Sequence, residues 1–193
     1  DYLDGFFENI PEDCIVIPDI GGNLVWTLQT AKTRDSNMLF TNFSNASMGC
    51  ALPIAIGAAI GTGSTRKIYC IAGDGGFQMN IQELLTVKKY NLPIEIIILN
   101  NSGYGIIKQF QDSYFKSKYT ATSKNDLFGD TINFVKIAEA YGVKTLRDIP
   151  IPETQKIYPK LEFGNSLENM TPYIDFESDM IVPVPPKKKL GWN

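Results

Sequence analysis

The stretch from Gly73 to Asn101 decides the fold of this chain and reads GDGGFQMNIQELLTVKKYNLPIEIIILNN. An apolar run, Lys67–Ala72, leads directly into its first residues, and a second apolar run, Ile94–Leu99, leads into the paired asparagines at its end. Two strands with buried-looking sequences therefore each end at a side chain with an oxygen ligand, Asp74 or Asn101. In parallel sheets, ligands bind at the carboxyl ends of the strands. Such oxygen ligands beside a glycine-lined loop suit Mg²⁺ and a diphosphate group.

The bulk composition sets loose limits on the class of protein. The chain has 193 residues, of which 44% are apolar and 20% are charged, and this suits one domain with a full hydrophobic core. A net charge of −3 gives no electrostatic reason to expect a nucleic acid or an anionic membrane as a partner. No apolar run reaches the ~20 residues that span a bilayer. The chain contains no histidine, which excludes serine–histidine, cysteine–histidine and histidine-ligated zinc chemistry within it.

The cysteines bear on the redox environment of the protein. Cys14, Cys50 and Cys70 are widely spaced and lack the paired spacing of a metal site. Because Cys14 and Cys70 lie in strand-like runs, we predict buried thiols and a cytoplasmic location rather than a disulfide. No secretory signal is visible, and the chain begins at Asp1 rather than at a methionine, which indicates a fragment, a processed product or a trimmed chain.

Predicted strands and helices alternate along the chain. The predicted strands are Cys14–Pro18, Met38–Thr41, Lys67–Ala72, Ile94–Leu99 and Val143–Leu146. The predicted helices are Asp1–Ile10, Leu24–Ala31, Ala51–Ile60, one that starts at Asn80, Tyr104–Phe110 and Thr131–Tyr141. This alternation predicts an α/β protein with three layers, α/β/α, around a mainly parallel central sheet. Four residues each follow a predicted strand, so their loops should converge on one rim of the sheet: Gly21, Met48, Asp74 and Asn101.

Three local signals refine this scheme. Asn80 and Glu83 have the spacing of a helix cap, with apolar residues at helical spacing after Asn80. These apolar residues are Ile81, Leu84, Leu85 and Val87. Gly142 predicts the end of the helix that starts at Thr131. The segment Gly61–Thr65 has the composition of a phosphate loop, but it lacks the lysine and precedes a strand, so it predicts a surface turn.

Two segments resemble thiamine-diphosphate-dependent enzymes, whose cofactor motif starts with Gly-Asp-Gly and ends with Asn-Asn. Gly73–Leu84 is most similar to the acetolactate synthase branch, and Ser47–Ala58 extends the similarity in the same order. The resemblance covers about residues 1–146. It implies the thiamine-diphosphate-binding fold, and within these enzymes the C-terminal diphosphate-binding (PP) domain, with thiamine diphosphate and Mg²⁺ as cofactors.

The resemblance also implies residue roles. The side chains of Asp74 and Asn101 and the carbonyl of Gly103 would bind Mg²⁺. Met48 would support the V-shaped conformation of the cofactor, and backbone groups of Ala46 and Met48 would hold its pyrimidine ring. The family often has glycine at the position of Ala46. The remaining cofactor contacts implied by the family are Gly21, Gly22, Asn23, Gly73, Gly75 and Gly76.

The implied activity is decarboxylation of a 2-keto acid such as pyruvate, followed by ligation of the resulting carbanion to a second carbonyl. A simple 2-keto-acid decarboxylase, the beta subunit of a two-chain decarboxylase and a non-catalytic cofactor-binding module are alternatives. The family activates its cofactor with a glutamate from a pyrimidine-binding domain, which has no counterpart in this sequence. We therefore expect this chain alone to be inactive. The missing domain would come from the parent chain or from a partner subunit, and apolar surface near Met48 and Asp74 predicts a homo-oligomer.

The last part of the chain departs from the family. Residues 1–149 are predicted to form the PP domain, and the proline-rich residues 150–193 an extended tail. Relatives carry another helix and strand before this tail. We therefore expect a segment to be missing near residues 148–151.

Overall fold

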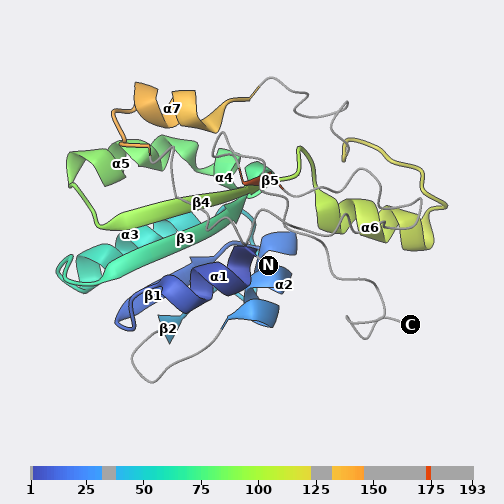
Figure 1. Cartoon of the computed structure of the whole chain (residues 1–193). Helices are drawn as coiled ribbons and strands as arrows, with labels where there is room; N and C mark the ends of the chain where they lie inside the picture. Colours follow the sequence, from blue (N-terminus) through green and yellow to red (C-terminus); the bar gives the residue numbers. More distant parts are fainter. Residues whose placement is uncertain (1, 32–37, 123–131, 146–172, 175–193) are drawn as a thin grey trace.

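The computed structural model describes residues 2–31, 38–122, 132–145 and 173–174 (Figure 1). The strands are β1 (Cys14–Pro18), β2 (Met38–Leu39), β3 (Lys67–Gly73), β4 (Ile94–Asn100) and β5 (Tyr173–Ile174). They form one sheet in the order β2-β1-β3-β4-β5. The first four are parallel, and β5 runs antiparallel to β4. The prediction of a mainly parallel sheet is confirmed.

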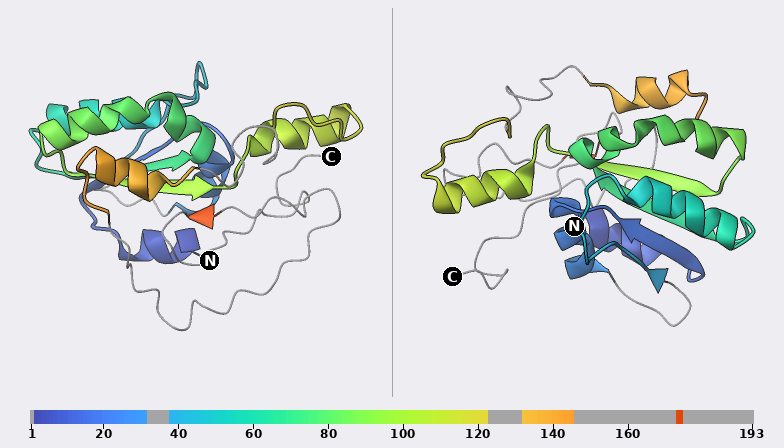
Figure 2. Two further views of the ribbon diagram at one scale, coloured as in Figure 1. Left: turned by 90° about the horizontal axis from the view of Figure 1, so that it is seen from above. Right: turned by 180° about the vertical axis from the view of Figure 1, so that it is seen from behind.

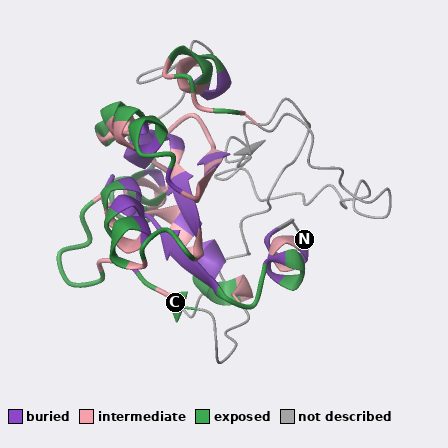
Figure 3. Cartoon of the chain, turned by 90° about the vertical axis from the view of Figure 1, so that its left-hand side faces the viewer, coloured by how far each residue is buried: buried purple, intermediate pink, exposed green. Residues whose placement is uncertain are grey.

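Helices cover both faces of this sheet and make it the middle of three layers (Figure 2). The helices on these faces are α1 (Tyr2–Asn9), α2 (Gly22–Thr30), α3 (Ala51–Gly61), α4 (Asp74–Met79), the 3₁₀-helix η1 (Ile81–Glu83), α5 (Leu84–Lys89) and α7 (Phe134–Ala140), whereas α6 (Gly105–Tyr114) lies beyond the ends of the strands. Successive strand residues point to opposite faces. Cys14 and Val16 therefore belong to a core cluster with α1 and α2, whereas Ile15 and Ile17 belong to one with α3, α4, α5 and α7. β1 and β3 are almost entirely buried, whereas most residues of β4 are half-buried (Figure 3).

The register of the sheet places the two ends of the Gly73–Asn101 stretch together. β3 and β4 pair in parallel, with Gly73 opposite Leu99. Asp74 directly follows β3, and Asn101 directly follows β4. The two residues therefore leave neighbouring strands at the same edge, as the sequence predicts.

A helical segment begins after Asn80 as predicted, with η1 from Ile81 running directly into α5, but the expected side-chain cap is not formed. α4 already begins at Asp74, and Asn80 separates α4 from η1 without a side-chain cap. Its Nδ2 instead donates to the carbonyl oxygen of Gly49 at 2.7 Å. This distant partner orients the side chain, whose Oδ1 accepts from Nε2 of Gln82 at 3.2 Å rather than from a backbone amide of the helix. Leu85, predicted to share a face with Leu84 and Val87, is 60% exposed.

The predicted strand Val143–Leu146 is also not observed. Residues 143–145 form no strand, and Leu146 lies outside the described residues. Val143 instead packs against the core cluster beside α7. α7 is shorter than predicted, because the Asn133 side chain caps it by accepting from the Lys136 amide at 2.9 Å. Gly142, with a φ of 72°, follows the helix as predicted.

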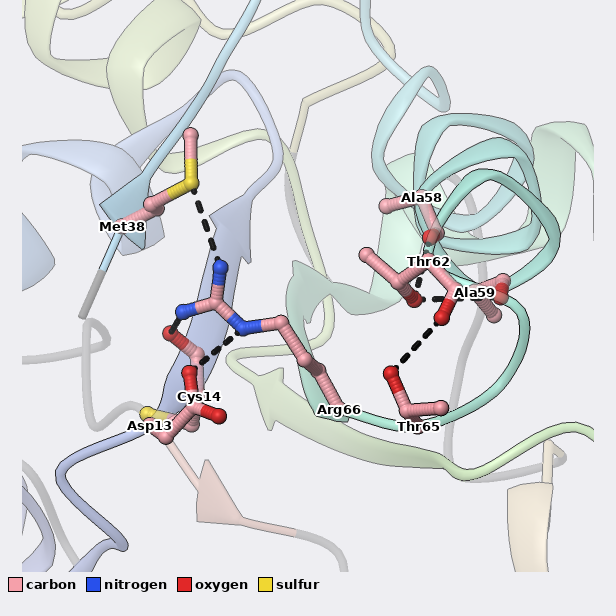
Figure 4. A network of polar contacts seen from close by, with 8 residues as sticks. All are labelled: Asp13, Cys14, Met38, Ala58, Ala59, Thr62, Thr65 and Arg66. Carbon is pink, nitrogen blue, oxygen red and sulfur yellow. Dashed lines mark hydrogen bonds and ion pairs between the residues drawn. The ribbon is translucent and has the colours of Figure 1, made fainter. Parts of the chain in front are cut away.

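The predicted surface turn at Gly61–Thr65 is confirmed (Figure 4). The Thr65 hydroxyl donates to the carbonyl of Thr62 at 2.7 Å, so this polar side chain finds its partner within the turn. The next residue, Arg66, approaches Asp13 with a 2.7 Å ion pair and donates to the carbonyl of Cys14 at 3.3 Å. These contacts tie β1 to β3 at the ends opposite Asp74.

Cys14 and Cys70 are buried free thiols, as predicted, and Cys50 is a half-buried one. Within the described residues, no helix is both long and apolar enough to cross a membrane. The expected missing segment near residues 148–151 lies outside the described residues. So does the tail 150–193, apart from β5.

Candidate functional site

Asp74 lies at the centre of the candidate site. It is the first residue of α4, is 3% exposed, and its Oδ2 atom has no hydrogen-bond partner among the described residues. Burial raises the pKa of its carboxyl to about 6, although backbone amides, including those of Gly103 and Asn101, act to lower it. A buried carboxylate oxygen without a partner is costly. A bound cation would relieve this cost, so the residue fits a metal ligand.

The loop after β4 brings further oxygen atoms to Asp74. The side-chain oxygen of Asn100 accepts from the amide of Ser102 at 2.9 Å, and that of Asn101 accepts from the amide of Gly103 at 3.2 Å. These bonds fold the loop back on itself, and an amide oxygen keeps a second lone pair. The described residues contain no group of three or more His, Cys, Asp or Glu that could hold a metal. A single carboxylate with neutral oxygens is compatible with Mg²⁺, which commonly completes its shell with water and phosphate.

Two glycines in the first turn of α4 are also needed for packing. A Cβ atom on Gly75 would lie 2.3 Å from the Tyr104 ring, and one on Gly76 would lie 1.9 Å from Oδ2 of Asp19. Both glycines are buried. Both are cofactor contacts implied by the family resemblance, and larger residues at either position would also displace the neighbours of α4.

The loop between β1 and α2, residues 19–21, is shorter than the sequence predicts. α2 begins at Gly22 rather than at Leu24, so Gly22 and Asn23 lie in its first turn. The side-chain nitrogen of Asn23 donates to the carbonyls of Asp19 at 2.7 Å and Ile71 at 3.2 Å, which uses both of its hydrogens. Backbone amides in the first turn have no acceptor within the helix. Those of Gly22 and Asn23 are therefore the groups that the start of α2 can offer to a phosphate.

Asp19 is a site residue that the sequence analysis missed. It directly follows β1 and is fully buried. Its carboxylate accepts from the amide of Gly49 at 2.9 Å and from that of Ala51 at 3.2 Å. A signal was present, because a charged residue directly follows a buried strand here just as Asp74 follows β3.

The structure brings the predicted loops together. The loop of residues 42–50, called the Met48 loop, touches α4, because a Cβ on Gly49 would lie 3.1 Å from the carbonyl oxygen of Gly76. The start of α2 approaches the end of β3, where a Cβ on Gly73 would lie 3.6 Å from Oδ1 of Asn23. Met48 itself is half-buried, and Ala46 is exposed.

Ala46 has a backbone conformation that disfavours its side chain. Its φ is 47°, in the left-handed region where a Cβ atom costs about 1 kcal/mol. Ala46→Gly is therefore expected to stabilise the cofactor-free protein by up to about 1 kcal/mol. The measurement is the midpoint of urea unfolding, with an unchanged slope.

The control for this prediction is Ala58→Gly. Ala58 lies in the middle of α3, where glycine costs about 1 kcal/mol. The two substitutions should shift the urea midpoint in opposite directions, and a loss of stability for both would contradict the strain at Ala46.

Comparison with known proteins identifies the family. The family profile described as "Thiamine pyrophosphate enzyme, C-terminal TPP binding domain" matches residues 19–163. The chain belongs to this family. Its TPP-binding domain begins in this match at Asp19 and includes the α4 motif, the Met48 loop and the Asn101 loop. Thiamine pyrophosphate is the same compound as thiamine diphosphate.

Several similar curated proteins are acetolactate synthase large subunits. The chain is 37% identical to acetolactate synthase isozyme 2 large subunit of Escherichia coli K12 over 134 residues, which is 69% of this chain and 23% of that protein. It is 33% identical over 186 residues to a probable acetolactate synthase large subunit of Methanococcus aeolicus, covering 94% and 29% of the two chains. A large subunit from Pyropia yezoensis is 36% identical over 175 residues, covering 79% and 29%. The chain thus spans less than a third of each of these relatives.

Proposed function

We propose that this TPP-binding domain serves an acetolactate-synthase-like enzyme that depends on thiamine diphosphate and Mg²⁺. The enzyme would decarboxylate a 2-keto acid such as pyruvate and ligate the remaining carbon unit to a second carbonyl. The observation that carries the proposal is the buried Oδ2 of Asp74, which has no partner among the described residues and lies at the edge where β3 and β4 end. Similarity to acetolactate synthase large subunits supports the reaction class.

In this proposal the chain binds and orients the cofactor. Asp74, Asn101 and the carbonyl of Gly103 would hold Mg²⁺, and first-turn amides of α2 and α4 would face the diphosphate. Met48 would pack beneath the two rings, where an apolar and pliable side chain fits best. The cofactor, when bound, supplies the carbon nucleophile that releases CO₂ from the keto acid.

The proposal includes a partner domain over the rim. Large apolar side chains are exposed on the Met48 loop, on α4 and on α6, which projects beyond the ends of the strands (Figure 1). They are Phe43, Met79, Ile106, Ile107, Phe110 and Tyr114. Several large apolar side chains exposed near one end of a sheet are typical of an interface. We propose that a pyrimidine-binding domain, from the parent chain or a partner subunit, covers it in a cytoplasmic homo-oligomer.

The reaction is tested by product analysis of the full-length protein. With pyruvate, thiamine diphosphate and Mg²⁺ present, acetolactate is the expected main product. Acetaldehyde instead would indicate a simple decarboxylase, and the absence of both, together with cofactor binding, would indicate a non-catalytic module.

A further inference from the structure

Gly49, the residue after Met48, has a conformation that only glycine adopts easily. Its φ is 81°, and a Cβ atom would lie 2.7 Å from Cβ of Met79 and 3.1 Å from the carbonyl oxygen of Gly76. The loop is therefore pressed against α4 at this point. Any rotation of the peptide groups of Gly49 would move Met48, since the two residues share one of them.

Side chains from two distant segments hold both polar groups of Gly49. Its amide donates to Oδ2 of Asp19 at 2.9 Å, and its carbonyl accepts from Nδ2 of Asn80 at 2.7 Å. Asp19 follows β1, whereas Asn80 follows α4. The position of Gly49 is thus set relative to the sheet and to the helix that carries Asp74.

Asp19 is tied to the loop by more than one bond. Its Oδ1 accepts from the amide of Ala51 at 3.2 Å and lies 3.6 Å from the sulfur of Cys50. Asp19 is fully buried, and burying a carboxylate is costly unless its oxygens are hydrogen-bonded or bind a cation. Any displacement of the loop would therefore leave the buried carboxylate of Asp19 without its partners. This cost opposes movement of the loop relative to β1.

We propose that Asp19 and Asn80 are positioning residues: they clamp Gly49 and thereby fix the backbone of the neighbouring Met48. This inference rests on the proposed function, in which Met48 supports the cofactor. Neither side chain needs to touch the cofactor. Their effect on it would pass entirely through Met48, and that makes the inference testable.

The first test measures the clamp without any cofactor. In the full-length protein, Asn80→Ala should speed hydrogen exchange at the amides of Gly49 and Ala51 by about fivefold or more, the effect of losing one hydrogen bond. Asn133→Ala is the matched control, because it removes an asparagine cap on α7 and should leave exchange in the Met48 loop unchanged. Unchanged exchange in Asn80→Ala would overturn the clamp. Asp19→Asn should act in the same direction as Asn80→Ala, because its side-chain NH₂ group would face one of the two backbone amides that donate to Asp19.

The second test asks whether the clamp acts through Met48. By calorimetry with Mg²⁺, Asn80→Ala should weaken thiamine diphosphate binding by about fivefold or more, but by less than about twofold in a Met48→Ala background. Equal effects in both backgrounds would overturn the positioning role while leaving the proposed function intact. If the unmodified protein binds no thiamine diphosphate, the proposed function fails and the role of Met48 fails with it; the exchange experiment still decides whether the clamp exists.

Discussion

Asp74→Asn is expected to weaken Mg²⁺-dependent binding of thiamine diphosphate by more than about 100-fold, since even outer partners of a bound metal contribute about 10–100-fold. The same substitution should stabilise the cofactor-free protein by about 1–2 kcal/mol. The reason is that a neutral amide costs less to bury than a carboxylate whose Oδ2 has no partner among the described residues. Calorimetry and urea unfolding, both with and without EDTA, measure the two effects.

Asp13→Asn provides the control carboxylate. Asp13 is well exposed and pairs with Arg66 at the opposite end of the sheet. Its substitution should change stability by less than about 1 kcal/mol and leave cofactor binding unchanged. Binding that needs no metal, or that survives Asp74→Asn, would refute the metal site. A large loss of stability in Asp74→Asn would refute the idea that the carboxylate is strained without its cation.

Gly76→Ala is expected to be strongly destabilising. The added Cβ would lie 1.9 Å from Oδ2 of Asp19, which is fully buried and held by the backbone amides of Gly49 and Ala51. Because the carboxylate has nowhere to move, the cost should be about 3 kcal/mol or more. For a domain of this size, that lowers the melting temperature by about 6–12 °C.

Gly57→Ala makes the same chemical change in another helix. No atom lies within 4 Å of a Cβ on Gly57, which is exposed on α3. Helix propensity alone favours alanine by up to about 1 kcal/mol, so this variant should be slightly more stable. Propensity favours alanine at Gly76 as well, and a fall in melting temperature there can only come from the contact with Asp19. Stabilisation by both substitutions would contradict the packing of α4 on Asp19.

Much of the site could be predicted from local sequence. Strand β3 ends at Gly73 and β4 at Asn100, and a parallel sheet places the residues after them at one edge. Asp74 and Asn101 therefore come together whatever the remaining packing is. Helix α3 and the turn at Gly61–Thr65 were likewise predictable, because their signals are short-range.

The failures share a physical cause. Asn80 has the spacing of a helix cap, yet its side chain reaches the carbonyl of Gly49, a residue far away in the sequence. Val143 and Thr145 are β-branched and suit a strand, but Val143 packs beside α7 instead. In both cases a tertiary contact outcompetes a local preference of a few tenths to about 1 kcal/mol.

The sequence by itself determined the α/β class, the edge at which Asp74 and Asn101 meet and the family to which the motif points, because strand periodicity and motif spacing are local properties. Only the tertiary structure decided that Asp74 keeps a buried oxygen without a partner among the described residues. The same holds for the two hydrogen bonds by which Asp19 and Asn80 bind the amide and the carbonyl of Gly49. Burial and long-range hydrogen bonds depend on which segments meet in space. No pattern within one segment specifies that meeting.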